Sequence, residues 1–325
     1  MRQLKFSQAL NEALHQEMER DEDVFVLGQD VGKMGGDFGV TKGLWKKYGE
    51  KRVIDTPLSE AAMLGLSNGA AFTGLRPVVE IMFADFITEC FDQIVNNSAK
   101  AHYMFAGQLT APIVLRTANG GGFRAAYHHS QNPEAWLMNI PGITVVAPST
   151  PYEAKGLLTA SIRSENPIVF FEHKMLYSTS GEVPEENYEL PLGKAKVKKE
   201  GTDVTVIASM KMCEYALKAA KELEKEEISL EVIDPRTLVP FDKETIFDSV
   251  AKTNRLVVAY EAPKTGGYGA EIAGLVNDEM FEFLKAPVKR VASLDSPVAF
   301  SPKLEDHILP GYEEVLNGIK EVIDY

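Results

Sequence analysis

The first half of the chain alternates short apolar runs with helical patterns. Strands are predicted where β-branched and apolar residues cluster, at Val24–Gly28, Arg52–Asp55, Pro77–Ile81, Ile113–Arg116, Thr144–Ala147 and Ile168–Glu172. Helical periodicity lies between them, at 7–20, 59–74, 85–101 and 151–164, with Ser7, Ser59 and Thr150 as candidate N-caps. This alternation predicts an α/β unit whose parallel sheet carries helices on both faces.

A second and smaller alternation follows a polar segment. Residues 178–201 contain Pro and Gly without a hydrophobic period, so we interpret them as a connection. Beyond it, strands are predicted at Val204–Ala208, Leu230–Ile233, Leu256–Tyr260 and Pro287–Ala292, and helices at 212–225, 242–252, 269–284 and 312–323. We therefore predict two domains, 1–180 and 202–325, joined by a linker at 181–201.

Composition narrows the class of protein. The 325 residues are 45% hydrophobic and 25% charged, an ordinary globular mixture, and the net charge of −13 argues against nucleic acid or an anionic membrane as main partner. The acidity either aids solubility or attracts a basic partner. No apolar run is long enough to span a bilayer, and no hydrophobic signal core follows Met1. Cys90 and Cys213 lie in apolar segments, so we expect buried thiols and a cytoplasmic location.

Candidate chemistry lies in the turns that follow the predicted strands, since ligands bind beyond the carboxyl ends of parallel strands. These turns contain Asp30, Glu60, Ala84-Asp85-Phe86 and Asn119–Phe123. Each has a structural alternative: Glu60 could only complement a helix dipole, and Phe86 could be core. Gly120–Gly122 resembles a phosphate cradle but lacks the residues of a P-loop or dinucleotide fingerprint. His128 and His129 have no metal-ligand neighbours, so we expect no metal site on this chain.

Several motifs, in order along the whole chain, resemble one family. They are 55–60 (Asp-Thr-Pro-Leu-Ser-Glu), Ala84-Asp85-Phe86, His129-Ser130-Gln131, 148–156, 171–177 and 234–242. The family is the beta subunit of the thiamine-diphosphate-dependent first component of 2-oxoacid and acetoin dehydrogenase complexes. The resemblance implies a parallel-sheet pyrimidine-binding domain followed by a transketolase-type C-terminal α/β domain.

The resemblance also implies the site residues. Glu60 matches the glutamate that bonds the aminopyrimidine nitrogen of thiamine diphosphate and favours its imino tautomer, which then activates the thiazolium carbon. Leu58, Met82 and Phe86 match cofactor contacts. His129 matches the histidine near the substrate and the incoming lipoyl group, and with Glu60 it forms the expected catalytic pair. His128 stands where relatives commonly have Gln, so no role is implied for it.

One absence is informative. The family holds Mg²⁺ on the cofactor's diphosphate with a Gly-Asp-Gly motif, and the nearest match here, Gly36-Asp37-Phe38, departs at its third residue. The resemblance therefore implies that an alpha subunit supplies the Mg²⁺ ligands in a two-alpha, two-beta assembly. The small residues of helix 61–74 suit close packing at such an interface. Some relatives bind a monovalent cation near 161–166, where Ser164 here replaces an acidic residue, so we expect none.

The substrate is acetoin, pyruvate or a branched-chain 2-oxoacid. The segments 80–86, 122–126 and 300–306 look most like acetoin dehydrogenase beta subunits, so we predict cleavage of acetoin to a hydroxyethyl adduct and acetyl transfer to a lipoyl-bearing acyltransferase. The same role on pyruvate or branched-chain 2-oxoacids remains an alternative. A hypothesis of another class is a subunit whose main duty is docking onto the acyltransferase core.

Overall fold

The computed structural model describes residues 1–325, which divide into two compact units. The first unit comprises 1–119 and 136–192, and the second comprises 120–135 and 193–325. Segment 120–135 therefore packs with the second unit although it lies within the first alternation of the sequence. The linear boundaries 1–180, 181–201 and 202–325 remain a prediction.

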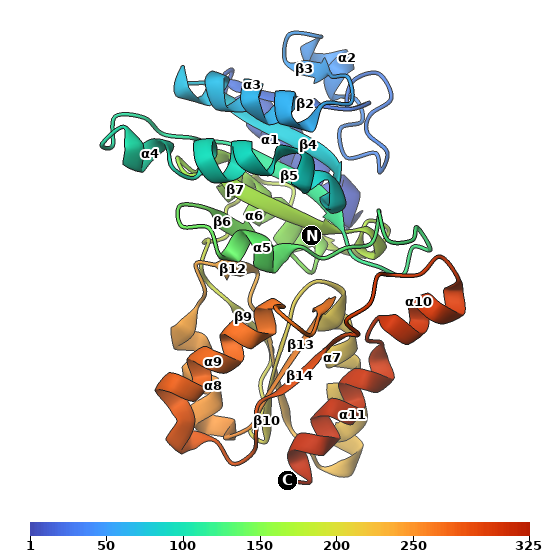
Figure 1. The fold of residues 1–325 in the computed structure, drawn as a ribbon. Helices are drawn as coiled ribbons and strands as arrows, with labels where there is room; N and C mark the ends of the chain where they lie inside the picture. The colour runs from blue at the N-terminus through green and yellow to red at the C-terminus, as the bar shows by residue number, and fades with distance from the viewer. The chain divides into compact units, whose positions relative to one another are not determined.

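The first unit is built on a parallel sheet, as predicted (Figure 1). Its strands run in the order β6-β7-β5-β4-β2-β3. Their bounds are β2 (Val24–Gly28), β3 (Val53–Asp55), β4 (Arg76–Phe83), β5 (Val114–Asn119), β6 (Thr144–Val146) and β7 (Ile168–His173). Strands β2, β5 and β7 are buried along their whole length, and β2 accordingly reads as a continuous apolar run, whereas β5 and β7 each begin with an apolar run and continue with polar residues.

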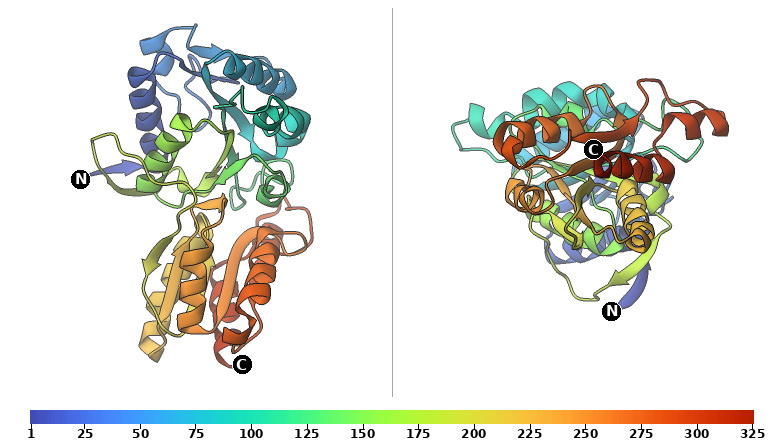
Figure 2. Two further views of the ribbon diagram at one scale, coloured as in Figure 1. Left: turned by 90° about the vertical axis from the view of Figure 1, so that its left-hand side faces the viewer. Right: turned by 90° about the horizontal axis from the view of Figure 1, so that it is seen from below.

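Helices cover both faces of this sheet (Figure 2). Helices α1 (Phe6–Arg20) and α6 (Pro151–Arg163) pack against each other on one face. On the other face lie α3 (Glu60–Phe72), the 3₁₀ helix η1 (Ala84–Cys90), the π-helical turn η2 (Gln93–Ser98) and α4 (Ala101–Met104). Two short helices complete the unit, α2 (Leu44–Tyr48) and η3 (Lys174–Leu176). The boundary between segment 120–135 and residues 136–192 falls within α5 (Glu134–Met138).

Local signals predicted some helix starts and not others. Thr150 caps α6 as predicted, since its hydroxyl accepts a hydrogen bond from the backbone N–H of Glu153. Ser59 occupies the N-cap position of α3 but makes no side-chain cap bond, and Ser7 lies inside α1. The helix predicted at 85–101 is confirmed as a helical segment but not as one regular α-helix, because it consists of η1, η2 and α4. In η2, the Ser98 hydroxyl donates to the carbonyl of Gln93, a side-chain bond that competes with regular helical pairing.

The connection predicted at 178–201 contains two strands, which corrects that interpretation. β8 (Ser180–Val183) pairs antiparallel with β1 (Arg2–Lys5), and β9 (Lys196–Lys199) pairs antiparallel with β11 of the second unit. Both are short and rich in polar residues, and β9 closes one edge of its sheet. Edge strands of this kind lack the apolar run by which buried strands are found in a sequence.

The second unit is a smaller α/β sandwich, as predicted. Its sheet has the order β14-β13-β10-β11-β9, parallel except for β9. The remaining strands of this sheet are β10 (Val204–Ala208), β11 (Leu230–Asp234), β13 (Leu256–Pro263) and β14 (Lys289–Ser293), and the short strand β12 (Thr237–Val239) lies outside it. The helices are α7 (Lys211–Leu223), η4 (Glu224–Glu226), α8 (Lys243–Thr253), α9 (Tyr268–Met280), η5 (Phe281–Phe283), α10 (Pro302–Ile308) and α11 (Tyr312–Ile323).

Helices α7 and α11 pack on one face of this sheet and α8 and α9 on the other (Figure 1). Buried Val315 and Ile319 place α11 within the core of the unit. None of the helices in the structure combines the length and apolar character that crossing a lipid bilayer would take.

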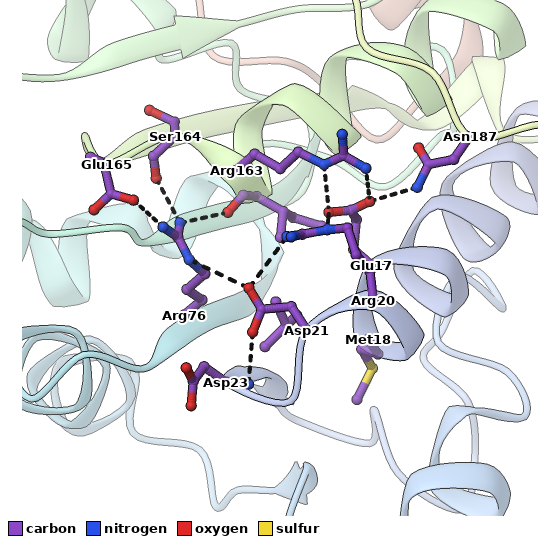
Figure 3. Close-up of polar contacts among 12 residues, drawn as sticks. Glu17, Met18, Arg20, Asp21, Asp23, Arg76, Arg163, Ser164, Glu165 and Asn187 are labelled. Atoms are coloured by element: carbon purple, nitrogen blue, oxygen red, sulfur yellow. Dashed lines mark hydrogen bonds and ion pairs between the residues drawn. The ribbon is translucent and has the colours of Figure 1, made fainter.

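A buried carboxylate fastens α1 to α6 (Figure 3). The Glu17 side chain is fully buried, and its two oxygens accept hydrogen bonds from Arg163 (2.7 and 2.9 Å), Arg20 (2.8 Å) and Asn187 (2.7 Å). Burial alone would raise the pKa of Glu17, but the hydrogen bonds from Arg163, Asn187 and Arg20 outweigh burial and lower that pKa. Charge pairing here therefore favours the folded state.

Beside this cluster, Arg76 clamps the end of α6 (Figure 3). Its Nη1 donates to the carbonyls of Ile162 (3.0 Å) and Ser164 (3.1 Å), and its guanidinium also pairs with Glu165 and Asp21. Arginine at a helix C-terminus satisfies carbonyls that have no partner within the helix. Two carbonyls of the turn at 161–166 are thus held by a cation that belongs to the protein.

We expect Glu17→Gln to lower the free energy of unfolding by about 2 kcal/mol at pH 7, because charge-assisted bonds are lost. The lowered pKa means that Glu17 stabilises the fold above its unfolded-state pKa, near 4.5, and that this contribution disappears as the pH falls through the folded-state pKa. Urea unfolding of both proteins at pH 7 and pH 4 measures the difference, which should shrink at pH 4. Glu189→Gln is the control, because its half-exposed pair with Arg163 should cost under about 1 kcal/mol. An equal loss from both variants would contradict this account.

Candidate active site

Three of the predicted turns lie at one edge of the first sheet. Strands β4, β2 and β3 are adjacent and parallel, so the turns that contain Asp30, Glu60 and Asp85 all follow carboxyl ends at the same edge. The fourth turn starts after β5 at the same edge, but its residues 120–135 pack with the second unit. The predicted convergence is therefore confirmed for the first three turns.

Glu60 is the first residue of α3 and is partly exposed. Its Oε1 accepts a hydrogen bond of 3.1 Å from the side-chain amide of Gln29, a buried residue directly after β2. Because β2 and β3 are neighbours, this contact joins two turns of the edge. Burial, and then the negative charge of Glu60, raise the pKa of the Cys90 thiol to about 12. Glu60 therefore lies near the end of η1 and has one carboxyl oxygen fixed by a donor.

The three apolar residues predicted to contact the cofactor lie at the same edge of the sheet but differ in solvent exposure. Phe86 is half-buried in η1, with its ring edge-on to Phe83 at 6.4 Å between centroids. Helix α3 packs against η1, so Phe86 and Glu60 belong to adjoining elements. Met82 is half-buried near the end of β4, whereas Leu58, between β3 and α3, is 81% exposed.

A buried ion-pair network lies behind Met82. Arg116 on β5 is 1% exposed and donates to both oxygens of Glu172 on β7, at 2.7 and 2.8 Å. It also donates to Glu80 on β4 at 2.7 Å, and the Tyr177 hydroxyl donates to Glu172 at 2.8 Å. Burial raises the pKa of Glu172 and raises that of Tyr177 well above its usual range. The residues of this network and Met82 line the same small internal cavity, so the buried charges lie next to Met82.

His129 lies in segment 120–135 of the second unit and is half-buried. Its backbone N–H donates to the carbonyl of Ala126 at 3.3 Å. The neighbouring His128 is exposed and its ring meets that of Tyr127 edge-on at 4.2 Å. His128 therefore faces outward as a surface residue.

The residues of the edge fit one half of thiamine diphosphate. An oriented carboxyl group beside apolar side chains suits a flat, polar-edged aminopyrimidine ring. Within residues 1–325, no group of three or more His, Cys, Asp or Glu side chains gathers into a metal site.

Comparison with known proteins identifies both units. Residues 2–179 match the family model of the transketolase pyrimidine-binding domain, and residues 193–315 match that of the transketolase C-terminal domain. A solved structure, a split-gene transketolase described as an inactive beta4 tetramer, superposes with a TM-score of 0.81 at 24% identity, covering 99% of this chain and 98% of that one. This likeness shows the fold.

Sequence relatives decide the family. The chain is 46% identical to the beta subunit of acetoin:2,6-dichlorophenolindophenol oxidoreductase of Bacillus subtilis, covering 99% of this chain and 98% of the relative. It is 44% identical to the 2-oxoisovalerate dehydrogenase beta subunit of the same organism (99% of each) and 45% identical to a pyruvate dehydrogenase E1 component beta subunit of Staphylococcus epidermidis (100% of each). The chain belongs to this family of dehydrogenase beta subunits.

In this beta subunit, sequence reasoning missed the groups that hold the site in place. No pattern in the sequence singles out Gln29, which donates to Glu60, or Glu261 and Glu305, which bind the glycine-rich loop. The Arg116 network carried a usable signal, because Arg116 and Glu172 interrupt apolar strands of a sheet covered on both faces. A charge at such a position has to be paired when it is buried.

Proposed function

We propose that this chain is the beta subunit of a thiamine-diphosphate-dependent enzyme that cleaves acetoin and passes the acetyl group to a lipoyl-bearing acyltransferase. The observation that carries the proposal is Glu60, a partly exposed carboxyl group at the start of α3 with one oxygen held by Gln29. Bound thiamine diphosphate would supply a carbon nucleophile, which protein side chains lack. The chain's own residues then have to bind, orient and move protons.

Each site residue receives a proposed role. Because Gln29 donates to Oε1 of Glu60, we assign the carboxyl proton to Oε2, from which Glu60 donates to the aminopyrimidine nitrogen. Leu58, Met82 and Phe86 contact the pyrimidine ring and exclude water from it. His129 donates a proton to the substrate oxygen, or stabilises charge that develops there, when the lipoyl group arrives.

We propose an alpha subunit as the obligate partner, in a two-alpha, two-beta assembly, and assign the Mg²⁺ ligands to it. Helix α3 supports this, because its outward face exposes Ala61, Ala62, Leu66 and Gly69. Small apolar residues allow the backbone of a partner helix to approach closely. The buried thiols of Cys90 and Cys213, which form no disulfide, support a reducing compartment, and we propose the cytoplasm.

Acetoin is the proposed substrate, and the alternatives are pyruvate and branched-chain 2-oxoacids. The support is modest in size: 46% identity to an acetoin-oxidising relative against 44% and 45% to relatives named for 2-oxoisovalerate and pyruvate. In all three reactions the carbon nucleophile of the cofactor would attack a carbonyl carbon next to the bond that breaks. Glu60 and His129 would therefore have the same roles with each substrate.

Reconstitution tests the proposal. The chain alone should be inactive, and turnover should appear with the alpha subunit, thiamine diphosphate and Mg²⁺, at a kcat/KM for acetoin at least tenfold above those for pyruvate and 3-methyl-2-oxobutanoate. Adding the lipoyl-bearing acyltransferase should couple the reaction to acetyl-lipoamide formation. Full turnover by the isolated chain would refute the need for a partner, and a preference for either 2-oxoacid would refute acetoin.

A further inference from the structure

The segment that contains His129 begins with an unusual backbone. Every second residue from 120 to 126 has a positive φ: Gly120 (+88°), Gly122 (+81°), Arg124 (+62°) and Ala126 (+59°). In such backbone, neighbouring N–H groups point toward the same side and form a concavity that binds anions. Arg124 and Ala126 have side chains that disfavour this conformation, so contacts from outside the segment have to hold it.

Carboxylates from the second unit fill this concavity. Oε1 of Glu305, on α10, accepts hydrogen bonds from the backbone N–H groups of Gly122 (2.8 Å) and Arg124 (3.4 Å). Oε2 of Glu305 accepts from the Arg124 guanidinium at 2.9 Å, and Glu261 accepts from the N–H of Gly121 at 2.9 Å. The Glu305 side chain is 0% exposed, so its carboxylate is buried and binds the backbone of the loop.

The packing leaves the segment little freedom. Leu309, directly after α10, lies so close to Gly121 that an added Cβ would stand 2.2 Å from its Cδ1. Arg124 also donates to Asp306 (2.7 Å) and to the carbonyl of Pro302 (3.1 Å), so α10 is bound at three of its residues. The glycine-rich stretch therefore binds anions, and these anions are carboxylates of the chain itself.

This anchoring extends to the histidine. Ala126, the last residue of positive φ, accepts a hydrogen bond from the backbone N–H of His129. We infer that Glu305 is a positioning residue: by holding the amides of Gly122 and Arg124, it fixes the backbone from which His129 presents its imidazole. The inference rests on the role proposed for His129. It means that α10, through Glu305, fixes the position of a proposed catalytic residue.

Glu305→Gln tests this with nearly unchanged shape. We expect the amides of 121–129 to exchange hydrogen at least tenfold faster, because a Gln side chain carries no charge for the concavity. We also expect the His129 imidazole signal, identified by its loss in His129→Gln, to shift or broaden. In the reconstituted enzyme, kcat for acetyl transfer to the lipoyl domain should fall about tenfold while the KM for acetoin changes less than twofold.

Two further variants make the result interpretable. Glu314→Gln, an exposed carboxylate that accepts from the N–H of Gly311 at 2.9 Å, is the matched control and should change none of the three measurements. If Glu305→Gln folds poorly, Arg124→Gln takes its place as the test, because Arg124 is partly exposed. We expect Arg124→Gln to show a weaker form of the same effect. Unchanged exchange at 121–129, or faster exchange with an unmoved imidazole signal and full acetyl transfer, would overturn the inference. Full activity of His129→Gln would instead refute the proposed role of His129, while the exchange result still tests the anchor.

Discussion

Replacing Glu60 with Gln should lower the cofactor-dependent turnover of the reconstituted enzyme by about 10²- to 10⁴-fold, the range measured for general acid–base groups. Gln has nearly the shape of Glu but cannot supply the proton that Glu60 is proposed to hold on the oxygen opposite Gln29. Steady-state rates with saturating alpha subunit, thiamine diphosphate and Mg²⁺ measure the loss. It should appear in kcat and not only in KM, because the proton acts during cofactor activation.

Controls separate this loss from unfolding and from the docking hypothesis. Glu89→Gln removes an exposed carboxylate from the neighbouring η1 and should leave the rate within twofold. Glu60→Gln should bind the acyltransferase core as tightly as the native chain does. If the variant binds the core and also turns over at the native rate, Glu60 is not catalytic, whereas equal losses of core binding and turnover would indicate unfolding.

The sequence predicts the two sheets well, because their central strands are buried on both faces. The pattern locates β2 and β10 to the residue, since no charged residue interrupts Val24–Gly28 or Val204–Ala208. Strands with a solvated face leave no such signal, and β8 and β9 were read as a linker for that reason. The segment predicted as a helix at 85–101 is helical but irregular, and hydrophobic periodicity does not detect local side-chain bonds such as that from Ser98 to Gln93.

The candidate site divides in the same way. Pattern and turn position were enough to place Glu60 at a helix start on the ligand-binding edge of a parallel sheet. They could not show that Gln29 orients it, because that contact depends on β2 and β3 being neighbours. The glycine-rich loop shows the limit most clearly: its partners Glu261 and Glu305 are 140 and 183 residues away along the chain from the amides they bind.

Replacing Arg116 with Met should destabilise the chain by about 3–5 kcal/mol, the cost of removing one partner from a buried ion pair. Glu172 is 1% exposed, and without the guanidinium it would keep the hydrogen bond from Tyr177 but face the negative charge of Glu80 with no cation between them. Urea unfolding of the purified chain measures the change. The control is Lys320→Met, because its pair with Glu226 is exposed at both ends and should be worth under about 1 kcal/mol.

The sign of the pH dependence checks the mechanism. Burial already raises the pKa of Glu172, and loss of Arg116 should raise it further. A carboxyl group whose pKa is higher in the folded than in the unfolded state destabilises the fold as the pH rises between those two values. The deficit of Arg116→Met should therefore be larger at pH 8 than at pH 5. Adding Glu172→Gln removes the titrating group and should recover part of the loss and flatten its pH dependence, whereas a deficit that is equal at both pH values would mean that lost packing, and not unpaired charge, makes Arg116 essential.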